Sequence, residues 1–145
     1  AGIGYFTLPM VRAGATVTAV ERNPVAFEYL LENAMRNGVT DRVHAYRGDN
    51  RDVVPELATE EPFERVVMGF YEAWEYLDVA IPALAAGGTL HMHEATPEGL
   101  VPDRPVERLE GAAADSDREV EVLDVRRVKG YSEGVAHVVV DARIE

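Results

Sequence analysis

The sequence predicts an α/β fold with a Rossmann-like, doubly wound sheet that is mostly parallel and ends in an antiparallel strand pair. Runs rich in β-branched residues alternate along most of the chain with segments whose apolar residues recur at helical spacing. A glycine-rich segment, AGIG, directly precedes the first of these helical segments. Two long β-rich runs near the C-terminal end are separated by very few residues, so they must pair antiparallel.

The N-terminal third gives a helix, a strand and a second helix. Residues 5–13 predict a helix, and residues 15–20 predict a strand that ends at Glu21. Asn23 has the chemistry of a helix N-cap and Pro24 suits the first helical position, so we expect the second helix to begin here and to end before Gly38.

The middle of the chain continues the alternation of strands and helices. We expect strands at residues 42–49, 63–70 and 89–95, with helices at residues 52–58 and 72–88 between them.

The C-terminal part departs from this alternation, because one amphipathic helix is followed by two strands. We expect the helix at residues 104–118 and the strands at residues 119–131 and 134–144. No linker or repeat interrupts the chain, so residues 1–145 are predicted to form a single domain. The helix at residues 5–13 has no preceding strand to complete its crossover unit, so we expect the first strand of the sheet to be missing and the chain to be the C-terminal part of a longer protein.

Composition limits the possible classes of protein. The chain has 145 residues, no cysteine, 26 acidic residues against 14 basic ones and a formal net charge of −12. Disulfides, thiolate metal sites and a cysteine nucleophile are therefore excluded. No segment resembles a membrane span or a signal peptide, so we expect a cytoplasmic protein. The single lysine and the high acidity indicate either a salt-adapted source or an ordinary acidic enzyme.

The glycine-rich segment predicts a cofactor loop. Gly2 and Gly4 allow a sharp turn and a close approach to a ligand, with a helix N-terminus nearby. The dinucleotide fingerprint has a third glycine where this chain has Thr7, so the pattern alone is weak. Glu21, at the carboxyl end of the next strand, is placed to accept hydrogen bonds from both ribose hydroxyls of an adenosine, although it can also be a solvated charge.

The segment RGDNRD adds a second polar pair at the same edge of the predicted sheet. Asp49 and Asn50 follow the next strand, where their oxygens and amide can hydrogen-bond the amine and ring nitrogens of adenine. The same residues also suit a turn and a helix N-cap. Taken with Gly2, Gly4 and Glu21, they favour a nucleoside cofactor.

Six segments resemble, in order, the archaeal and eukaryotic tRNA transferases of the wybutosine pathway and their relatives that methylate N1 of guanine-37. They are AGIGYFTLP, AVERNPVAFEYLLENAMRNGV, GDNRDV, RVVMGF, GGTLHMHEATPE and VRRVKGYSEGVAHVVVDARI. The resemblance implies a class I enzyme that uses S-adenosyl-L-methionine and acts on the tRNA anticodon loop. Together with the acidic composition, it leads us to expect an archaeal and halophilic source. It also implies that Gly2 and Gly4 line the methionine end of the cofactor, that Glu21 holds the ribose, and that Asp49 and Asn50 hold the adenine. In this family a tRNA-binding region precedes the part matched here, so we expect most tRNA contacts to lie in that missing region.

The resemblance also bears on the group transferred. The N1-methyltransferases carry an Asn-x-Pro motif where this chain has Gly69, Phe70 and Tyr71. Together with the later segment HMHE, this difference resembles the branch that transfers a 3-amino-3-carboxypropyl group. Methyl transfer to guanine-37 is the alternative. Glycine at position 69 leaves room for the bulkier group.

Other polar and aromatic residues are candidates for the substrate rim. His91 and His93 alternate with Glu94 along a predicted strand, so both histidines point to one face, where hydrogen bonding to substrate is favoured over metal binding. Tyr71 and Trp74 are equally suited to stacking on a base and to packing at a helix start.

Three further expectations concern partners and chemistry. We expect no metal and no membrane partner, and no residue can be assigned as the catalytic base. The basic cluster of Arg126, Arg127 and Lys129 either contacts tRNA or is simply solvated. An NAD-dependent oxidoreductase and a non-catalytic nucleotide-binding remnant are the alternatives from other classes; the first does not require Asp49 and Asn50.

Overall fold

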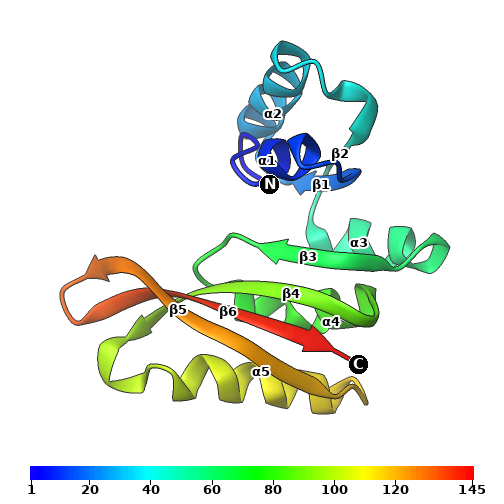
Figure 1. The fold of residues 1–145 in the computed structure, drawn as a ribbon. Coiled ribbons are helices and arrows are strands. Elements are labelled where there is room, and N and C mark those ends of the chain that lie inside the picture. Colours follow the sequence, from blue (N-terminus) through cyan, green and yellow to red (C-terminus); the bar gives the residue numbers. More distant parts are fainter. The chain divides into compact units, whose positions relative to one another are not determined.

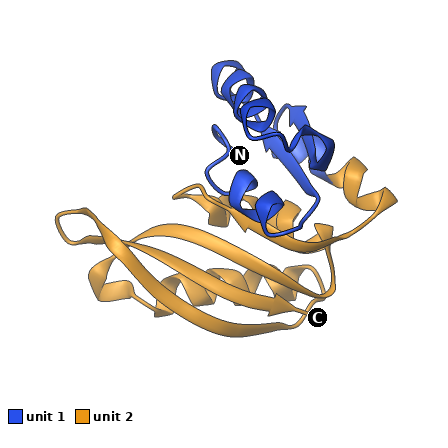
Figure 2. Cartoon of the chain, turned by 45° about the horizontal axis from the view of Figure 1, so that its top comes forward, with its two compact units in different colours: residues 1–54 blue, residues 55–145 orange.

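A computed structural model describes all 145 residues, Ala1–Glu145. The chain divides into two compact units, Ala1–Val54 and Pro55–Glu145, coloured separately in Figure 2. Each unit is described by itself. None of the helices is both long enough and apolar enough to cross a membrane.

The first unit contains a two-stranded parallel sheet with two helices. Its elements in chain order are α1 (Thr7–Arg12), β1 (Val17–Glu21), α2 (Pro24–Arg36), the 3₁₀ turn η1 (Thr40–Arg42) and β2 (Val43–Arg47). Strands β1 and β2 pair in parallel from Val17 opposite Val43 to Glu21 opposite Arg47.

The predicted start of α2 is confirmed. Asn23 Oδ1 accepts hydrogen bonds from the backbone N–H groups of Val25 and Ala26, and Pro24 is the first helical residue. A small core of Val11, Val17, Ala34 and Val39 joins both helices to the strands. This packing fixes the beginning of β1 relative to α1 and α2.

The second unit contains a four-stranded mixed sheet. Helix α3 (Asn50–Glu60) begins in the first unit and runs into the second. The remaining elements are β3 (Phe63–Met68), η2 (Ala73–Tyr76), α4 (Leu77–Ala83), β4 (Leu84–Pro97), η3 (Glu98–Leu100), α5 (Asp103–Asp115), β5 (Val120–Ser132) and β6 (Val135–Ile144).

The strand order in this sheet is β3-β4-β6-β5, as Figure 1 shows. Strand β3 is parallel to β4, whereas β6 is antiparallel to both β4 and β5. The antiparallel pairing of the last two strands is therefore confirmed. The last strand lies between β4 and β5, so it brings residues far apart in the sequence next to each other.

Alternation along β4 separates an apolar face from a polar one. Leu90 and Met92 are fully buried in a core with Leu109 of α5, Ile81 of α4 and Val140 of β6. His91 and His93 point to the opposite face, as expected from a period of two. Helices α4 and α5 therefore cover one face of the sheet, and the histidines lie on the other.

The predicted α/β fold class is confirmed, with a two-stranded parallel sheet in the first unit and a four-stranded mixed sheet in the second. One expectation about the elements needs correction. The helix predicted at residues 72–88 ends at Ala83, because Leu84 pairs with Phe63 of β3 and Gly88 pairs with Ile144 of β6. Pairing on both sides outweighs the helical propensity of the alanine-rich segment. The single domain predicted for residues 1–145 remains a prediction.

Candidate functional site

The predicted site residues fall into two groups, one in each compact unit. Gly2, Gly4, Glu21 and Asp49 lie in the first unit, where Asn50 opens α3. The substrate-rim candidates Gly69, Phe70, Tyr71, His91 and His93 lie in the second.

The glycine-rich loop has a backbone conformation that needs glycine. Gly2 has φ +60° and Gly4 has φ +104°, both in the region that L-residues avoid. At Gly4 a Cβ atom would also lie 3.2 Å from Leu30 Cδ1 and 3.3 Å from Leu8 Cγ. The loop therefore packs tightly on α1 and α2 at Gly4, whereas a Cβ atom at Gly2 would meet no atom within 4 Å.

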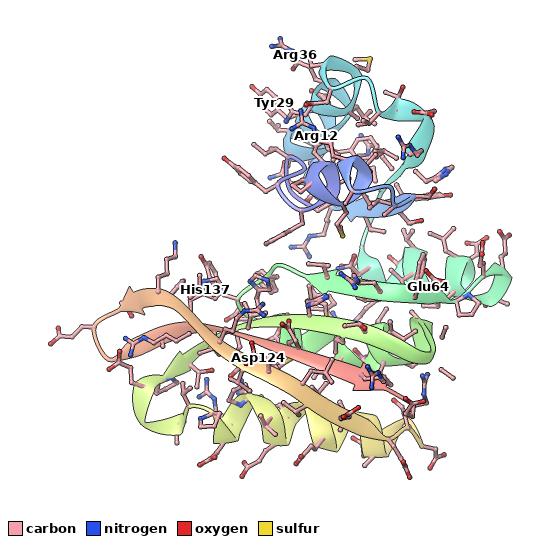
Figure 3. All side chains as sticks on the ribbon, in the orientation of Figure 1. Arg12, Tyr29, Arg36, Glu64, Asp124 and His137 are labelled. Atoms are coloured by element: carbon pink, nitrogen blue, oxygen red, sulfur yellow. The ribbon has the colours of Figure 1, made fainter.

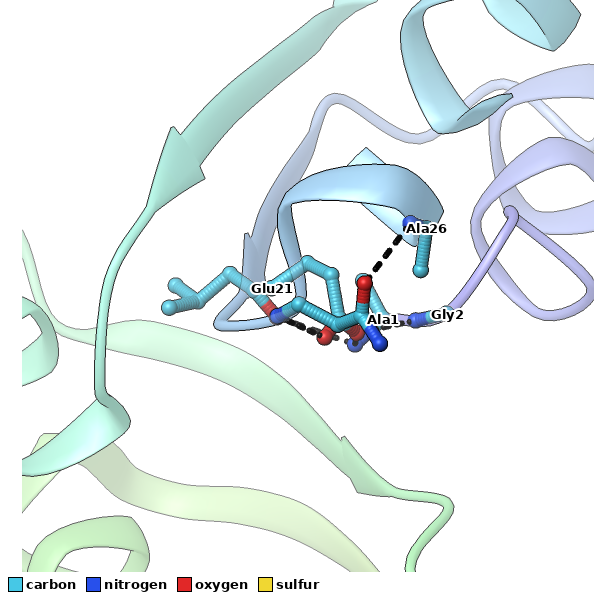
Figure 4. Close-up of polar contacts among 6 residues, drawn as sticks. Ala1, Gly2, Glu21 and Ala26 are labelled. Atoms are coloured by element: carbon cyan, nitrogen blue, oxygen red, sulfur yellow. Dashed lines mark hydrogen bonds and ion pairs between the residues drawn. The ribbon is translucent and has the colours of Figure 1, made fainter. Parts of the chain in front are cut away.

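Glu21 connects this loop to the start of α2. Its Oε2 accepts a hydrogen bond of 2.6 Å from Gly2 N–H, and its Oε1 accepts one of 2.8 Å from Asn23 N–H, as Figure 4 shows. Burial raises the pKa of Glu21, but the hydrogen bonds from Asn23 and Gly2 outweigh burial and leave the pKa below its ordinary value. The carboxylate is therefore held ionised and oriented at the end of β1.

Asp49 lies beside Glu21 because β1 and β2 end together. Gly48 N–H donates to Glu21 O at 3.1 Å, and Asp49 Oδ2 lies 3.6 Å from Arg22 Nη1. Asp49 Oδ1 accepts from Arg51 N–H at 2.9 Å, so Asp49 also serves the capping role that its sequence position allowed. These contacts bring the glycine loop, Glu21 and Asp49 together, and Asn50 follows as the first residue of α3.

This group has the chemistry required to hold an adenosine. An ionised carboxylate has about four lone-pair positions, so Glu21 can accept from ribose hydroxyls while it keeps its two backbone donors. The carboxylate of Asp49 is a suitable acceptor for the adenine amine. Because Gly2 and Gly4 present bare backbone, a ligand can approach the loop closely.

In the second unit, a cavity of about 330 Å³ lies next to the segment that follows β3. Its lining residues are Phe70, Tyr71, Glu72, Trp74, Ala95, Arg104, Arg108 and Tyr131. The backbone of this segment is tied to β4, because Ala95 N–H donates to Tyr71 O at 2.9 Å. Two predicted rim residues, Phe70 and Tyr71, therefore line one cavity together with Trp74.

A buried ion cluster supports the cavity. Glu94 of β4 is completely buried, and its Oε1 accepts from Thr96 Oγ1 at 2.7 Å, Arg108 Nη1 at 2.6 Å and Arg104 Nε at 3.2 Å. The guanidinium of Arg108 also lies 3.9 Å from the centre of the Trp74 ring, a cation–π geometry. Glu94 thus fixes two arginines of α5 at the cavity wall.

His91 and His93 belong to two separate contacts on the polar face. His91 Nδ1 lies 2.6 Å from Asp141 Oδ1, and Asp141 also binds Arg126. Burial raises the pKa of Asp141, but the hydrogen bonds from His91 and Arg126 outweigh it and lower the pKa.

His93 Nδ1 lies 2.9 Å from His137 Nε2, and His137 is labelled on β6 in Figure 3. Burial, followed by the neighbouring His137, lowers the pKa of His93 to about 4. Burial and the nearby charge of Lys129 also lower the pKa of His137. The pair is therefore neutral at pH 7. Neither histidine belongs to a group of three His, Cys, Asp or Glu side chains that could hold a metal ion.

Aromatic contacts join the histidine pair to the cavity wall. The Tyr71 ring packs edge-on against Tyr131 at 4.7 Å and against His137 at 4.9 Å between ring centres. Tyr131 and His137 lie on β5 and β6, so the hairpin that carries them forms part of the same site. Gly69 is exposed at the start of the segment after β3.

Part of the basic cluster predicted from the sequence is already paired. Arg126 forms ion pairs with Asp124 and Asp141, and Arg127 forms one with Glu98. The neighbouring carboxylates therefore partly neutralise both arginines, which should attract a phosphate less strongly than the sequence alone indicated.

The sequence did not point to Arg104, Arg108 or Tyr131 as site residues. It also did not indicate that Glu94 holds the two arginines. An Arg-x-x-x-Arg spacing on an amphipathic helix places both side chains on one face, and this was the available signal. The spacing alone could not indicate that this face meets the buried carboxylate of Glu94.

Comparisons with known proteins identify the family of the chain. Residues 1–123 match the model of the TRM5/TYW2 methyltransferase domain. Over its whole length the chain is 39% identical to a tRNA(Phe) (4-demethylwyosine(37)-C(7)) aminocarboxypropyltransferase of Methanocaldococcus jannaschii and covers 57% of that protein. The chain is also 30% identical to the tRNA (guanine(37)-N(1))-methyltransferase Trm5b of Pyrococcus abyssi. This match covers 99% of this chain and 42% of the relative.

A solved structure of this family has the same fold. The crystal structure of M. jannaschii TYW2 in complex with AdoMet superposes with a TM-score of 0.90 at 38% identity, covering 100% of this chain and 65% of that one. The chain thus spans little more than half the length of the first curated relative that it matches.

Proposed function

Because the chain belongs to the TRM5/TYW2 methyltransferase domain family, we propose that it is the S-adenosylmethionine-binding part of a tRNA-modifying transferase. We propose further that the enzyme transfers the 3-amino-3-carboxypropyl group to the modified guanosine at position 37, in the synthesis of a wybutosine derivative. The observation that carries this proposal is the 39% identity, over the whole chain, to an aminocarboxypropyltransferase.

The first unit supplies the groups that the cofactor needs. S-Adenosylmethionine carries a sulfonium, and this makes each carbon bound to the sulfur open to attack by a nucleophile. In our proposal the ionised Glu21 accepts from the ribose hydroxyls, and Asp49 with Asn50 binds the adenine edge. Gly2 and Gly4 line the methionine end, where a side chain would block the approach.

The second unit supplies the substrate rim. Gly69 stands where a methyltransferase of this family is expected to carry asparagine, so this position offers space and no amide to grip a base edge. Phe70 and Tyr71 line the adjoining cavity. In our proposal the reaction depends mainly on alignment of the reacting atoms, and no residue is assigned as a general base.

Methyl transfer to N1 of guanine-37 is the second candidate. It is favoured by the 30% identity to the Trm5b methyltransferase of P. abyssi, which also covers almost the whole chain. The two reactions use the same cofactor and differ in which carbon on the sulfur is transferred.

A single experiment separates the two candidates. The full-length protein is incubated with S-adenosylmethionine and two tRNA(Phe) substrates, one with unmodified guanosine-37 and one with 4-demethylwyosine-37. Mass spectrometry then identifies the modified nucleoside and the small product. Aminocarboxypropyl transfer leaves methylthioadenosine, whereas methyl transfer leaves S-adenosylhomocysteine. The proposal fails if only the second product forms, and both candidates fail if neither product appears.

Two finer points also remain proposals. The excess of acidic residues supports a salt-adapted archaeal source. Tight binding of tRNA is proposed to need a further region of the protein, since a surface that carries a net charge of −12 repels phosphates.

A further inference from the structure

One asparagine of the chain stands in a dipeptide that readily loses its side-chain amide. Asn37 is followed by Gly38, whereas the other three asparagines precede proline, alanine and arginine. Asparagine is a thermolabile residue type. It decays when the next backbone nitrogen attacks its side-chain carbonyl carbon, and glycine hinders this attack least because it has no Cβ atom. The sequence therefore makes Asn37 the most reactive amide of the chain.

The structure places this dipeptide where α2 ends, and hydrogen bonds hold both groups that would react. Asn37 has φ −91° and ψ −1°, and its Nδ2 donates to Asn33 O at 2.7 Å. The attacking nitrogen, that of Gly38, donates to Met35 O at 3.0 Å. Ring closure requires ψ of Asn37 to leave its helical value and Gly38 N–H to lose its proton. Both hydrogen bonds therefore oppose the reaction in the folded chain.

Arg12 adds a third restraint from another helix. Its Nη2 donates to Asn37 Oδ1, so the last residue of α1 holds the side-chain carbonyl at the end of α2. Figure 3 labels Arg12 together with Arg36, whose guanidinium pairs with Glu32 on α2 itself. The other two restraints on the dipeptide have backbone acceptors. Arg12 is therefore the restraint that a substitution can remove while the reacting groups stay unchanged.

We propose that Asn37 is a site of spontaneous deamidation, and that Arg12 controls its rate by restraining the side-chain amide. In the first step the Gly38 nitrogen bonds to Asn37 Cγ, the Cγ–Nδ2 bond breaks, and the proton of Gly38 N–H leaves with Nδ2 as ammonia. In the second step water opens the resulting five-membered imide at either carbonyl, which leaves aspartate or isoaspartate at this position. The inference does not depend on the proposed function, because water is the only co-reactant.

The two products affect the first unit differently. Aspartate leaves the main chain intact and places a carboxylate beside Arg12. Isoaspartate adds a methylene group to the main chain, in the turn where Val39 N–H donates to Ala34 O at 3.1 Å. Val39 and Ala34 belong to the small core that joins both helices to the strands. Isoaspartate should therefore destabilise the unit more than aspartate does.

The test follows the loss of the amide in the full-length protein by mass spectrometry of its peptides. Wild type, Arg12→Ala, Arg12→Met and the control Arg36→Ala are incubated in a mildly alkaline buffer, both folded and in concentrated urea. Liquid chromatography separates the amide, aspartate and isoaspartate forms of the peptide that contains Asn37. Gly38→Ala in urea tests the route, because a methyl group on the attacking residue should slow the reaction. Thermal unfolding shows whether each variant folds.

In urea we expect Asn37 to lose its amide faster than the other three asparagines, and at the same rate in wild type and in both Arg12 variants. In the folded wild type the reaction should be much slower than in urea. Arg12→Ala and Arg12→Met should each accelerate it in the folded protein by about ten-fold, as the loss of one hydrogen bond from a charged donor predicts. Arg36→Ala should react like the wild type.

Three results would overturn the inference. If another asparagine reacts faster in urea, the site is wrong. If Asn37 in the folded wild type reacts as fast as in urea, the end of α2 does not restrain it. Equal rates in the folded wild type and the Arg12 variants would remove Arg12 from control of the reaction. Should Arg12→Ala not fold, Arg12→Met decides the question, because it keeps most of the aliphatic stem and lacks only the donors.

Discussion

The two compact units organise their candidate site residues by different means. In Ala1–Val54 the arrangement depends on the backbone: two glycines with positive φ, and a carboxylate held by the N–H groups of Gly2 and Asn23. In Pro55–Glu145 it depends on side chains, with Glu94 holding Arg104 and Arg108 from another element. A backbone-based site can be changed by altering φ or one acceptor, whereas the side-chain cluster depends on the packing of the whole sheet.

The two units also differ in the size of their hydrophobic cores. The core of the second unit contains twelve fully packed residues, against four in the first. Strand β6 contributes to the larger core and to the polar face that carries Asp141 and His137. Disturbing the site of the second unit should therefore destabilise its fold, whereas disturbing the site of the first should mainly affect the binding of a ligand.

The largest expected effect is the loss of the buried carboxylate in the second unit. Glu94→Ala leaves two guanidiniums without their shared acceptor, and breaking a buried ion pair costs about 3–5 kcal/mol of the free energy of unfolding. Urea denaturation measures this loss. Glu110→Ala, at an exposed position of α5, the helix that carries the two arginines, should change the free energy of unfolding by less than about 0.5 kcal/mol. Equal stabilities of the two variants would show that the cluster does not support the unit.

The second effect is a pH dependence that belongs to the second unit. The pKa of His93 is lowered to about 4, from an ordinary value of 6.5. Between these values the unfolded chain binds a proton that the folded chain does not, so stability falls as the pH falls from about 6.5 toward 4. The full loss at and below pH 4 is about 3 kcal/mol, at 1.36 kcal/mol for each pKa unit.

Denaturation curves at several pH values test this effect in variants. His93→Asn should flatten the pH dependence between pH 6.5 and 4, although His137 will retain part of it, because its pKa is also lowered. His44→Gln, at an exposed position of β2 in the first unit, is the control for the replacement of a histidine. A wild-type pH profile in His93→Asn would contradict the assignment of this proton to the histidine pair.

The third effect tests the first unit through cofactor affinity. In our proposal Glu21 is an ionised acceptor of two ribose hydroxyls, so we expect Glu21→Ala to weaken S-adenosylmethionine binding by about 2 kcal/mol, or roughly thirty-fold. Isothermal titration calorimetry on the full-length protein measures the change. Glu28→Ala, an exposed substitution on α2, is the control and should bind cofactor normally. Unchanged affinity in Glu21→Ala would remove Glu21 from the cofactor site.

The same contrast explains what could be predicted from the sequence. Glu21 and Asp49 could be predicted from the sequence because a strand end and a helix cap are local features, and because parallel strands bring their carboxyl ends together. The turn and capping chemistry of Asn23 and Pro24 is equally local. The structure places Gly2, Glu21 and Asp49 close together, because Gly2 N–H donates to the Glu21 carboxylate and Gly48 N–H donates to Glu21 O, but their roles toward a cofactor remain predictions.

The site of the second unit was harder to predict from the sequence because its contacts join residues far apart in the chain. Glu94 meets Arg108 only after β4 and α5 have packed together, and Tyr131 meets Tyr71 only after the β5–β6 hairpin has joined β4 in the sheet. For the same reason the segment 84–88 was wrongly predicted as helix: its strand conformation depends on partners in β3 and β6. Neither a propensity nor a spacing contains this information.

The smallest expected effect compares the two glycines of the first unit. Both have positive φ, so alanine at either position should cost about 1 kcal/mol of backbone strain. Only at Gly4 would the new Cβ also crowd Leu30 and Leu8, at 3.2 and 3.3 Å. We therefore expect Gly4→Ala to destabilise the protein more than Gly2→Ala does. The difference in the free energy of unfolding should be about 1 kcal/mol or less, because α1 and α2 can shift to accommodate the methyl group.

Thermal unfolding and cofactor titration of both variants measure this difference. Gly2 N–H donates to Glu21 at 2.6 Å, and alanine disfavours the positive φ that directs this N–H, so Gly2→Ala should lose cofactor affinity with a smaller change in the unfolding temperature than Gly4→Ala. Gly4→Ala should lose both, because the strained residue packs against the helices that hold the loop. If Gly2→Ala bound cofactor normally while Gly4→Ala did not, the loop would act through its packing on α2, and the first unit would resemble the second in depending on side-chain contacts.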